Sequence, residues 1–180
     1  MPTRTDRPAR RWIPDGIRWC AVYDELVPVA DNSGIKLRVH PSDTSNHHVP
    51  FDGIGSNRMN DRYPSPRVGI RYGVGTRAEA GGSPLVPDEL NHCGRKDHLF
   101  LVHVRNVGTL ATAGAFEETM LDDGDLQIFE ILRALERVGF DGCINPNHVP
   151  QIAGDTDERM IAREYGVAYL KAMSAALAQP

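Results

Sequence analysis

The sequence lacks any apolar run approaching the roughly 20 residues that a membrane-spanning helix needs, so no membrane association is expected. It also lacks a basic excess: the net charge over 180 residues is −4, which gives no reason to expect nucleic acid as a partner. Cysteine is scarce, with Cys20, Cys93 and Cys143 showing no C-x-x-C spacing. An odd, widely spaced set is typical of a reduced, cytoplasmic protein.

The first 16 residues, MPTRTDRPARRWIPDG, lack the apolar core of a secretory signal and are rich in arginine and proline. An organelle transit peptide is the alternative, but Asp6 and the helix-breaking prolines argue against it. We therefore expect residues 1–16 to form a disordered or docking arm, and residues 17–180 to form the folded domain.

Apolar spacing in the rest of the chain predicts strands that alternate with helices. The predicted strands cover residues 35–40, 68–72, 99–104 and 140–144. The predicted helices cover residues 17–33, 125–138 and 157–177, with Gly34 and Gly139 ending the first two. Such alternation indicates a parallel α/β fold. The polar segment 41–66 is interpreted as a long loop, either functional or disordered.

Three histidines follow or close predicted strands: His40, His103 and His148. In parallel α/β proteins the carboxyl ends of the strands meet on one side of the sheet, where ligands bind. A single histidine at such a position is more often structural, but three in the same relative position favour a shared site. Histidine suits both metal binding and proton transfer near neutral pH, so both roles are expected there.

The remaining histidines give weaker signals. His47 and His48 lie in the long polar segment, where ordinary solvent exposure is the expected state, although they could line the mouth of a pocket. His92 and His98 flank Cys93, which suggests zinc, but no second ligand pair has suitable spacing. A surface turn is the preferred interpretation of this segment.

Arg105 lies two residues after His103, on the same face of an extended strand. It could hold a substrate carboxylate in a bidentate pair, or form a salt bridge at the end of the strand. Glu118, Asp122 and Asp123 precede a predicted helix, and Asp125 is expected to cap it.

Five blocks together resemble the mannonate dehydratase family, in order and spacing, from about residue 17 to the C-terminus. They are HPSD (40–43), LVHVRNV (101–107), FEETMLDDGD (116–125), ALERVGFDG (134–142) and PNHVPQ (146–151). The resemblance implies a (β/α)8 TIM barrel related to sugar isomerases of the xylose isomerase type. It also implies Mn²⁺ or Fe²⁺ as cofactor, and dehydration of D-mannonate to 2-keto-3-deoxy-D-gluconate in hexuronate breakdown.

The resemblance assigns metal-ligand positions to His40, His103 and Asn147. Asn147 stands where the family has an aspartate, and Gly73 stands where it has a cysteine. Losing a thiolate and a carboxylate removes two negative charges from around a dication, so weak or absent metal binding is expected. His148 is the candidate for proton transfer, and Arg105, which matches the family's VH-x-R arginine, for placing the substrate carboxylate.

A full barrel needs eight βα units and about 250 residues, whereas the sequence predicts four units that resemble the C-terminal half. Four parallel strands leave two open edges. We therefore expect a homo-oligomer, or association with a complementary half-barrel, unless the chain is part of a longer product. Two other functions stay open: a metal-dependent sugar isomerase or epimerase on the same barrel, and a non-catalytic remnant that binds a partner chain or a sugar acid.

Overall fold

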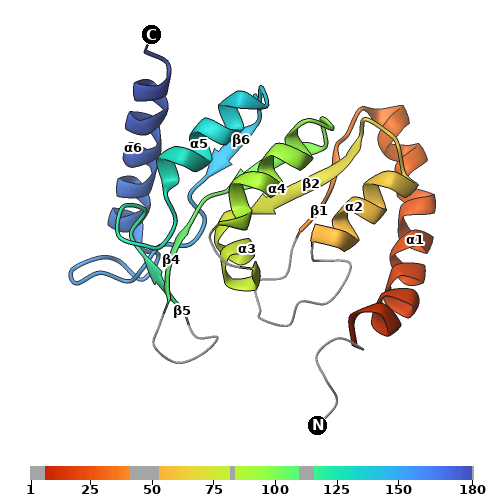
Figure 1. Cartoon of the computed structure of the whole chain (residues 1–180), viewed down its shortest axis with the longest axis horizontal. Helices are drawn as coiled ribbons and strands as arrows, with labels where there is room; N and C mark the ends of the chain where they lie inside the picture. The colour runs from red at the N-terminus through yellow and green to blue at the C-terminus, as the bar shows by residue number, and fades with distance from the viewer. Residues whose placement is uncertain (1–6, 41–52, 82–83, 110–115, 180) are drawn as a thin grey trace.

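The computed structural model describes residues 7–40, 53–81, 84–109 and 116–179 (Figure 1). Its main sheet has four strands in the order β1-β2-β3-β6. These are β1 (Leu37–Val39), β2 (Val68–Gly73), β3 (Leu99–His103) and β6 (Cys143–Asn145). Each neighbouring pair is parallel, and the strand order follows the chain. The predicted parallel α/β fold with four βα units is therefore confirmed.

Six helices accompany the strands among the described residues. They are α1 (Arg7–Ser33), α2 (Gly53–Arg62), α3 (Val74–Gly81), α4 (Leu85–Gly94), α5 (Ile128–Arg137) and α6 (Met160–Leu177). Figure 1 shows α1 and α2 at the β1 end of the sheet, and α5 and α6 at the β6 end. Within the described part of the chain, every helix is too short or too polar to cross a membrane.

The apolar core forms two clusters. The larger one joins β2 and β3 to the helices from α3 onward, and its most buried members include Val74, Leu90 and Val102. The smaller one joins α1, α2 and β1 around Tyr23 and Met59. Because burial of apolar surface is the main favourable term in folding, the larger cluster is expected to hold the strand ends in place.

Helix α1 begins at Arg7, well before the predicted residue 17. Residues 7–16 of the expected disordered or docking arm are therefore helical, whereas residues 1–6 lie outside the described part. Pro8 sits in the first turn, where its missing N–H has no helical acceptor to lose. At the other end, Gly34 has a φ of +72°, so the predicted stop is confirmed.

The predicted long loop over residues 41–66 contains a helix, α2, at Gly53–Arg62. The sequence GIGSNRMNDR has low helix propensity, so packing must supply the stability. Met59 is 1% exposed, and the ring of Tyr63 lies 5.5 Å from that of Tyr23 in α1. The loop interpretation is therefore wrong for residues 53–62, and residues 41–52 lie outside the described part.

Helix α5 is amphipathic, as predicted, and buries its apolar side in the larger cluster. It begins at Ile128, with Gln127 at the N-cap position, so the expectation that Asp125 caps it is wrong. The backbone N–H of Asp125 instead donates to Val107 O, at 2.9 Å. Gly139 has a φ of +68°, and the predicted helix end there is confirmed.

An antiparallel hairpin that the sequence did not reveal follows β3. Its strands are β4 (Asn106–Thr109) and β5 (Phe116–Thr119). The buried Asn106 side chain joins the hairpin to the next segment: its Nδ2 donates to Leu121 O, at 2.8 Å, and its Oδ1 accepts from Leu126 N, at 2.9 Å. Because the buried amide has all these hydrogen bonds, it fixes the hairpin relative to the segment that follows it. The hairpin strand β5 contains Glu118.

A polar cluster holds α3 against α4. Glu89 of α4 accepts from the Tyr72 hydroxyl, at 2.8 Å, and from Arg77 Nε of α3, at 2.6 Å. Burial raises the pKa of Tyr72, and the neighbouring Glu89 carboxylate raises it further, so the hydroxyl stays a donor. Helix α3 is thereby fixed at the end of β2, and it carries Glu79.

All three cysteines are free. Cys93 is buried in α4, and its desolvation raises the pKa of the thiol to about 11. A thiol that stays protonated is a poor nucleophile and a poor metal ligand.

Candidate active site

The predicted site residues lie along the carboxyl ends of the parallel strands. His40 follows β1 directly, Gly73 ends β2 and His103 ends β3. The strand register pairs Gly73 with His103, and His103 with Asn145 of β6. Residues far apart in the sequence are thus placed on one edge of the sheet, as expected for parallel strands.

His40 and His103 lie close together. Their ring centroids are 6.2 Å apart, with the planes at 82°. His103 is only 8% exposed, whereas His40 is exposed. The two imidazoles are therefore close enough to face the same ligand, and His103 is the more deeply buried of the two.

Asn147 and His148 line an open pocket of about 380 Å³ beyond β6. Its lining consists of Glu118, Asn147, His148, Val149, Asp157, Glu158, Arg159 and Arg163. His40 and His103 are not among these lining residues. The predicted site residues are therefore divided between a histidine pair and an adjoining polar pocket.

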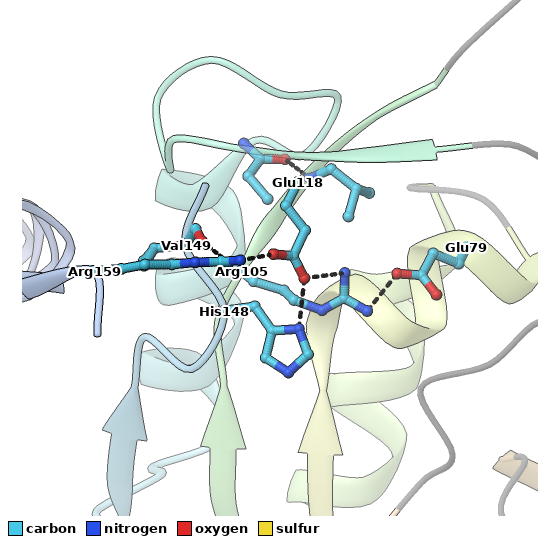
Figure 2. Close-up of polar contacts among 8 residues, drawn as sticks. Glu79, Arg105, Glu118, His148, Val149 and Arg159 are labelled. Carbon is cyan, nitrogen blue, oxygen red and sulfur yellow. Dashed lines mark hydrogen bonds and ion pairs between the residues drawn. The ribbon is translucent and has the colours of Figure 1, made fainter. Parts of the chain in front are cut away.

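Figure 2 shows His148 facing Glu118, which projects from β5. The distance from His148 Nδ1 to Glu118 Oε1 is 2.5 Å, and both side chains are partly buried. Thirty residues separate the two along the chain, and the hairpin brings them together. The pair joins a proton-transfer group to a carboxylate at the wall of a pocket.

Arg159 contacts the other oxygen of the same carboxylate. Its Nη1 lies 3.5 Å from Glu118 Oε2 and donates to Val149 O, at 2.6 Å. Arg159 precedes α6 with a φ of 58°, a left-handed conformation that is uncommon for a residue with a side chain. The surrounding contacts must stabilise this conformation, which directs Arg159 toward Glu118.

Asp155 fixes the start of α6 behind Arg159. Its Oδ1 accepts from Ile161 N and its Oδ2 from Ala162 N, each at 2.9 Å. Desolvation acts to raise the pKa of Asp155, but the hydrogen bonds from Ala162 and Ile161 outweigh it and lower the pKa below its ordinary value. An anionic cap of this kind also suits the positive end of the helix dipole.

Arg105 lies beneath Glu118 and is almost fully buried, with its side chain 3% exposed. It forms an ion pair with Glu79 of α3, whose side chain is 2% exposed, and its Nη1 lies 3.8 Å from Glu118 Oε1. A Cβ on Gly75 would lie 2.5 Å from Arg105 Cγ, so the arginine fits only because residue 75 is glycine. Of the two roles expected for Arg105, the structure contains the salt bridge at the strand end.

Glu79 and Glu118 were not assigned to the site from the sequence. Glu79 lies in a helix that was not predicted, and Glu118 depends on a hairpin whose pairing the sequence did not reveal. A weak signal did exist for Glu118, since it lies in the acidic block between Arg105 and the helix α5. Its pairing with His148 could be found only from the three-dimensional arrangement.

The residues present fit a tightly held metal ion poorly. Among the described residues, no group of three or more His, Cys, Asp or Glu side chains is placed to hold one. His40 and His103 offer two imidazoles, and Asn147 offers a neutral Oδ1 that is buried without a hydrogen-bond partner in the described part. Gly73 offers no donor. Mn²⁺ and Fe²⁺ sites normally include anionic oxygen or sulfur ligands, which this set lacks.

The other histidines lie elsewhere. His92 and Cys93 belong to α4, so the surface-turn interpretation is wrong for them. His98 follows that helix, and its Nδ1 lies 2.7 Å from Val68 O, at the amino ends of the strands. His47 and His48 lie outside the described residues.

Comparison with solved structures places the fold among xylose isomerase-like TIM barrels. Mannonate dehydratase from Streptococcus suis superposes with a TM-score of 0.76 at 23% identity, over 86% of this chain and 46% of that one. A xylose isomerase domain protein from Planctomyces limnophilus gives a TM-score of 0.69 at 16% identity, over 98% and 57%. The chain therefore has the fold of part of a TIM barrel, as predicted.

Sequence comparison identifies the family. The D-mannonate dehydratase (UxuA) family model matches residues 19–180. The mannonate dehydratase of Geobacillus thermodenitrificans is 31% identical over 82% of this chain and 42% of its own length. That of Lachnoclostridium phytofermentans is 30% identical over 91% of this chain and 49% of its own length. The chain spans less than half the length of either relative, and it belongs to the D-mannonate dehydratase family of hydro-lyases.

Proposed function

We propose that the chain contributes to the dehydration of D-mannonate to 2-keto-3-deoxy-D-gluconate and water, in cytoplasmic hexuronate and glucuronate catabolism. The observation that carries the proposal is the contact between His148 and Glu118, at 2.5 Å, beside a polar pocket at the strand ends of a family member. A histidine held by a carboxylate is suited to moving a proton on a bound sugar acid.

The proposed chemistry is a β-elimination. The C2–H bond breaks, its electron pair forms the C2–C3 double bond, and the C3 hydroxyl leaves as water after gaining a proton. The resulting enol rearranges to the 2-keto acid. His148 is the candidate for one of the two proton transfers, either as the base at C2 or as the acid at the C3 oxygen.

The substrate carboxylate has candidate partners in the arginines of the site. Arg105 is the one proposed from the sequence. Its guanidinium is buried, with Nη1 3.8 Å from Glu118 Oε1, so a substrate carboxylate would reach it only across the Glu118 side of the pocket. Arg159 and Arg163 line the pocket beside His148, together with Glu118, Asp157 and Glu158, and these two arginines are the groups there that could pair with a sugar acid.

Metal binding is proposed to be weak. Because the residues present fit a metal ion poorly, no step of the proposed reaction depends on one. We expect calorimetry with Mn²⁺ to show weak or no binding to the wild type. The double variant Gly73→Cys with Asn147→Asp introduces a thiolate at the strand position paired with His103 and a carboxylate at position 147, and it is expected to raise the affinity by about tenfold or more. Asn32→Asp, an exposed change in α1, is the charge control and should have no effect. Tight, stoichiometric binding by the wild type would contradict this expectation.

Association is proposed to complete the barrel. The end strands β1 and β6 each have one pairing partner in the main sheet among the described residues. Two copies, or this chain and a complementary half-barrel, could pair these edges. Light scattering of the purified chain is expected to show a homo-oligomer, or a complex of the two chains once a complementary half-barrel is added. A stable, monodisperse monomer would contradict association.

A non-catalytic remnant is the second candidate, favoured by the absence of ligand atoms at Gly73 and of a carboxylate at Asn147. Incubating D-mannonate and Mn²⁺ with the wild type and with the double variant separates the two. Formation of the keto acid by the wild type supports the dehydratase. Binding of D-mannonate without turnover supports the remnant, and turnover of aldoses or ketoses in its place would support an isomerase or epimerase.

A further inference from the structure

We infer that Glu118 is a positioning residue that fixes the tautomer and the orientation of His148, leaving Nε2 as the atom that exchanges a proton with substrate. The inference extends the proposed function, because it assigns the reacting atom of His148 and a role to Glu118. It rests on contacts that are independent of any metal ion.

The hydrogen-bond chemistry of the pair sets the tautomer. An ionised carboxylate only accepts, so the contact between Glu118 Oε1 and His148 Nδ1, at 2.5 Å, requires the hydrogen on Nδ1. A neutral imidazole with its hydrogen on Nδ1 carries the free lone pair on Nε2. Figure 2 shows this second ring nitrogen on the side of the ring turned away from Glu118.

Glu118 is itself held from two sides. Arg105 Nη1 lies 3.8 Å from Oε1, and Arg159 Nη1 lies 3.5 Å from Oε2. Both arginines are anchored elsewhere, Arg105 by its ion pair with Glu79 and Arg159 by Val149 O, at 2.6 Å. The carboxylate therefore has little freedom to turn away from His148, which is what a positioning group requires.

A purely stabilising role is a poorer explanation for the contact. The side chains of His148 and Glu118 are 37% and 26% exposed, and at this exposure even a charged pair adds little to stability. Both residues line the pocket, so the contact lies where a substrate would bind. Its main physical effect is to choose which imidazole nitrogen faces that substrate.

The direct test is ¹⁵N NMR of the histidine side chains in the full chain, treated with a chelator, at about pH 8.5, above the usual titration range of histidine. His148→Gln identifies the signals by their loss. The wild type is expected to show His148 mainly with its hydrogen on Nδ1. Glu118→Ala and Glu118→Gln should lower that fraction, because alanine has no acceptor and glutamine can donate as well as accept.

Glu117→Gln is the matched control, since it removes the same charge from the neighbouring, exposed position of β5. It should leave the tautomer unchanged. Circular dichroism melting establishes that each variant folds. If Glu118→Ala does not fold, the tautomer measured in Glu118→Gln tests the inference by itself. A wild type with its hydrogen on Nε2, or an unchanged tautomer in Glu118→Gln, would overturn the inference.

Steady-state kinetics gives a second test, because a purely structural role for Glu118 would not lower kcat while leaving KM unchanged. For the dehydration reaction, Glu118→Gln should lower kcat by roughly tenfold to a hundredfold with little change in KM, a loss similar to that seen when the partner of a functional histidine is removed. Equal kcat values would count against the positioning role. If the chain forms no keto acid, the proposed function fails while the tautomer result still stands or falls by itself.

Discussion

Replacing His148 by glutamine is expected to lower kcat for D-mannonate dehydration by roughly 100-fold to 10,000-fold, the range that a positioned acid–base group contributes. Glutamine has nearly the length of histidine and can bond to Glu118, so the hairpin and the pocket should stay in place. What it cannot do is accept and release a proton near neutral pH. The loss should therefore appear in kcat, with KM changed much less.

Steady-state formation of the keto acid measures this effect. His92→Gln is the matched control, because it makes the same substitution at an exposed position of α4, away from the strand ends. The control should retain the wild-type rate. A His148→Gln enzyme that retains more than about a tenth of wild-type kcat would show that His148 performs neither proton transfer.

The second large effect concerns the stability of the fold at the site. Arg105→Met is expected to lower the free energy of unfolding by about 3–5 kcal/mol, the usual result of removing one member of a buried ion pair. The side chains of Arg105 and Glu79 are 3% and 2% exposed, so Glu79 would remain charged and buried without its main partner. Urea unfolding followed by circular dichroism gives the difference.

Two companion variants test the cause. Arg133→Met removes an arginine from an exposed pair with Glu130 on α5 and should change stability by less than about 1 kcal/mol. Arg105→Met combined with Glu79→Leu removes both buried charges and should recover much of the loss. If the double variant is no more stable than Arg105→Met alone, the buried carboxylate is not the source of the effect.

The parallel sheet could be predicted because its signals are local. Residues 99–104 form an apolar run typical of a buried strand, and the helix that ends before Gly139 has a clear apolar side. Helix α2 could not be predicted, because its own sequence is a poor helix former and Met59 and Tyr63 are held by packing on α1. Tertiary contacts between distant segments decide such elements, and apolar periodicity does not record them.

The candidate site divides in the same way. The strand-end positions of His40 and His103 follow from parallel geometry, and the structure places their rings 6.2 Å apart. The partners of His148 and Arg105 could not be predicted, since Glu118 arrives on a hairpin and Glu79 on an unpredicted helix. Both carboxylates lie in segments without a strong apolar pattern, so the sequence alone does not predict which residues they contact.

The contacts of Glu118 and His148 show how the site could transfer a proton although it has few metal ligands. The resemblance predicts anionic ligands where this chain has Gly73 and Asn147, so a low affinity for a dication is expected. The group formed by Glu118, His148 and Arg159 contains none of the predicted metal ligands. In the proposed function, proton transfer therefore depends on residues that this chain retains.

Formation of 2-keto-3-deoxy-D-gluconate from D-mannonate tests the central claim most directly. The purified chain, at a concentration comparable to that of ¹³C-labelled D-mannonate and with excess Mn²⁺, should convert the substrate to the keto acid seen by ¹³C NMR. His148→Gln, which leaves Gly73 and Asn147 unchanged, should convert none in the same time. Absence of the keto acid with both the wild type and the Gly73→Cys, Asn147→Asp variant would contradict the account.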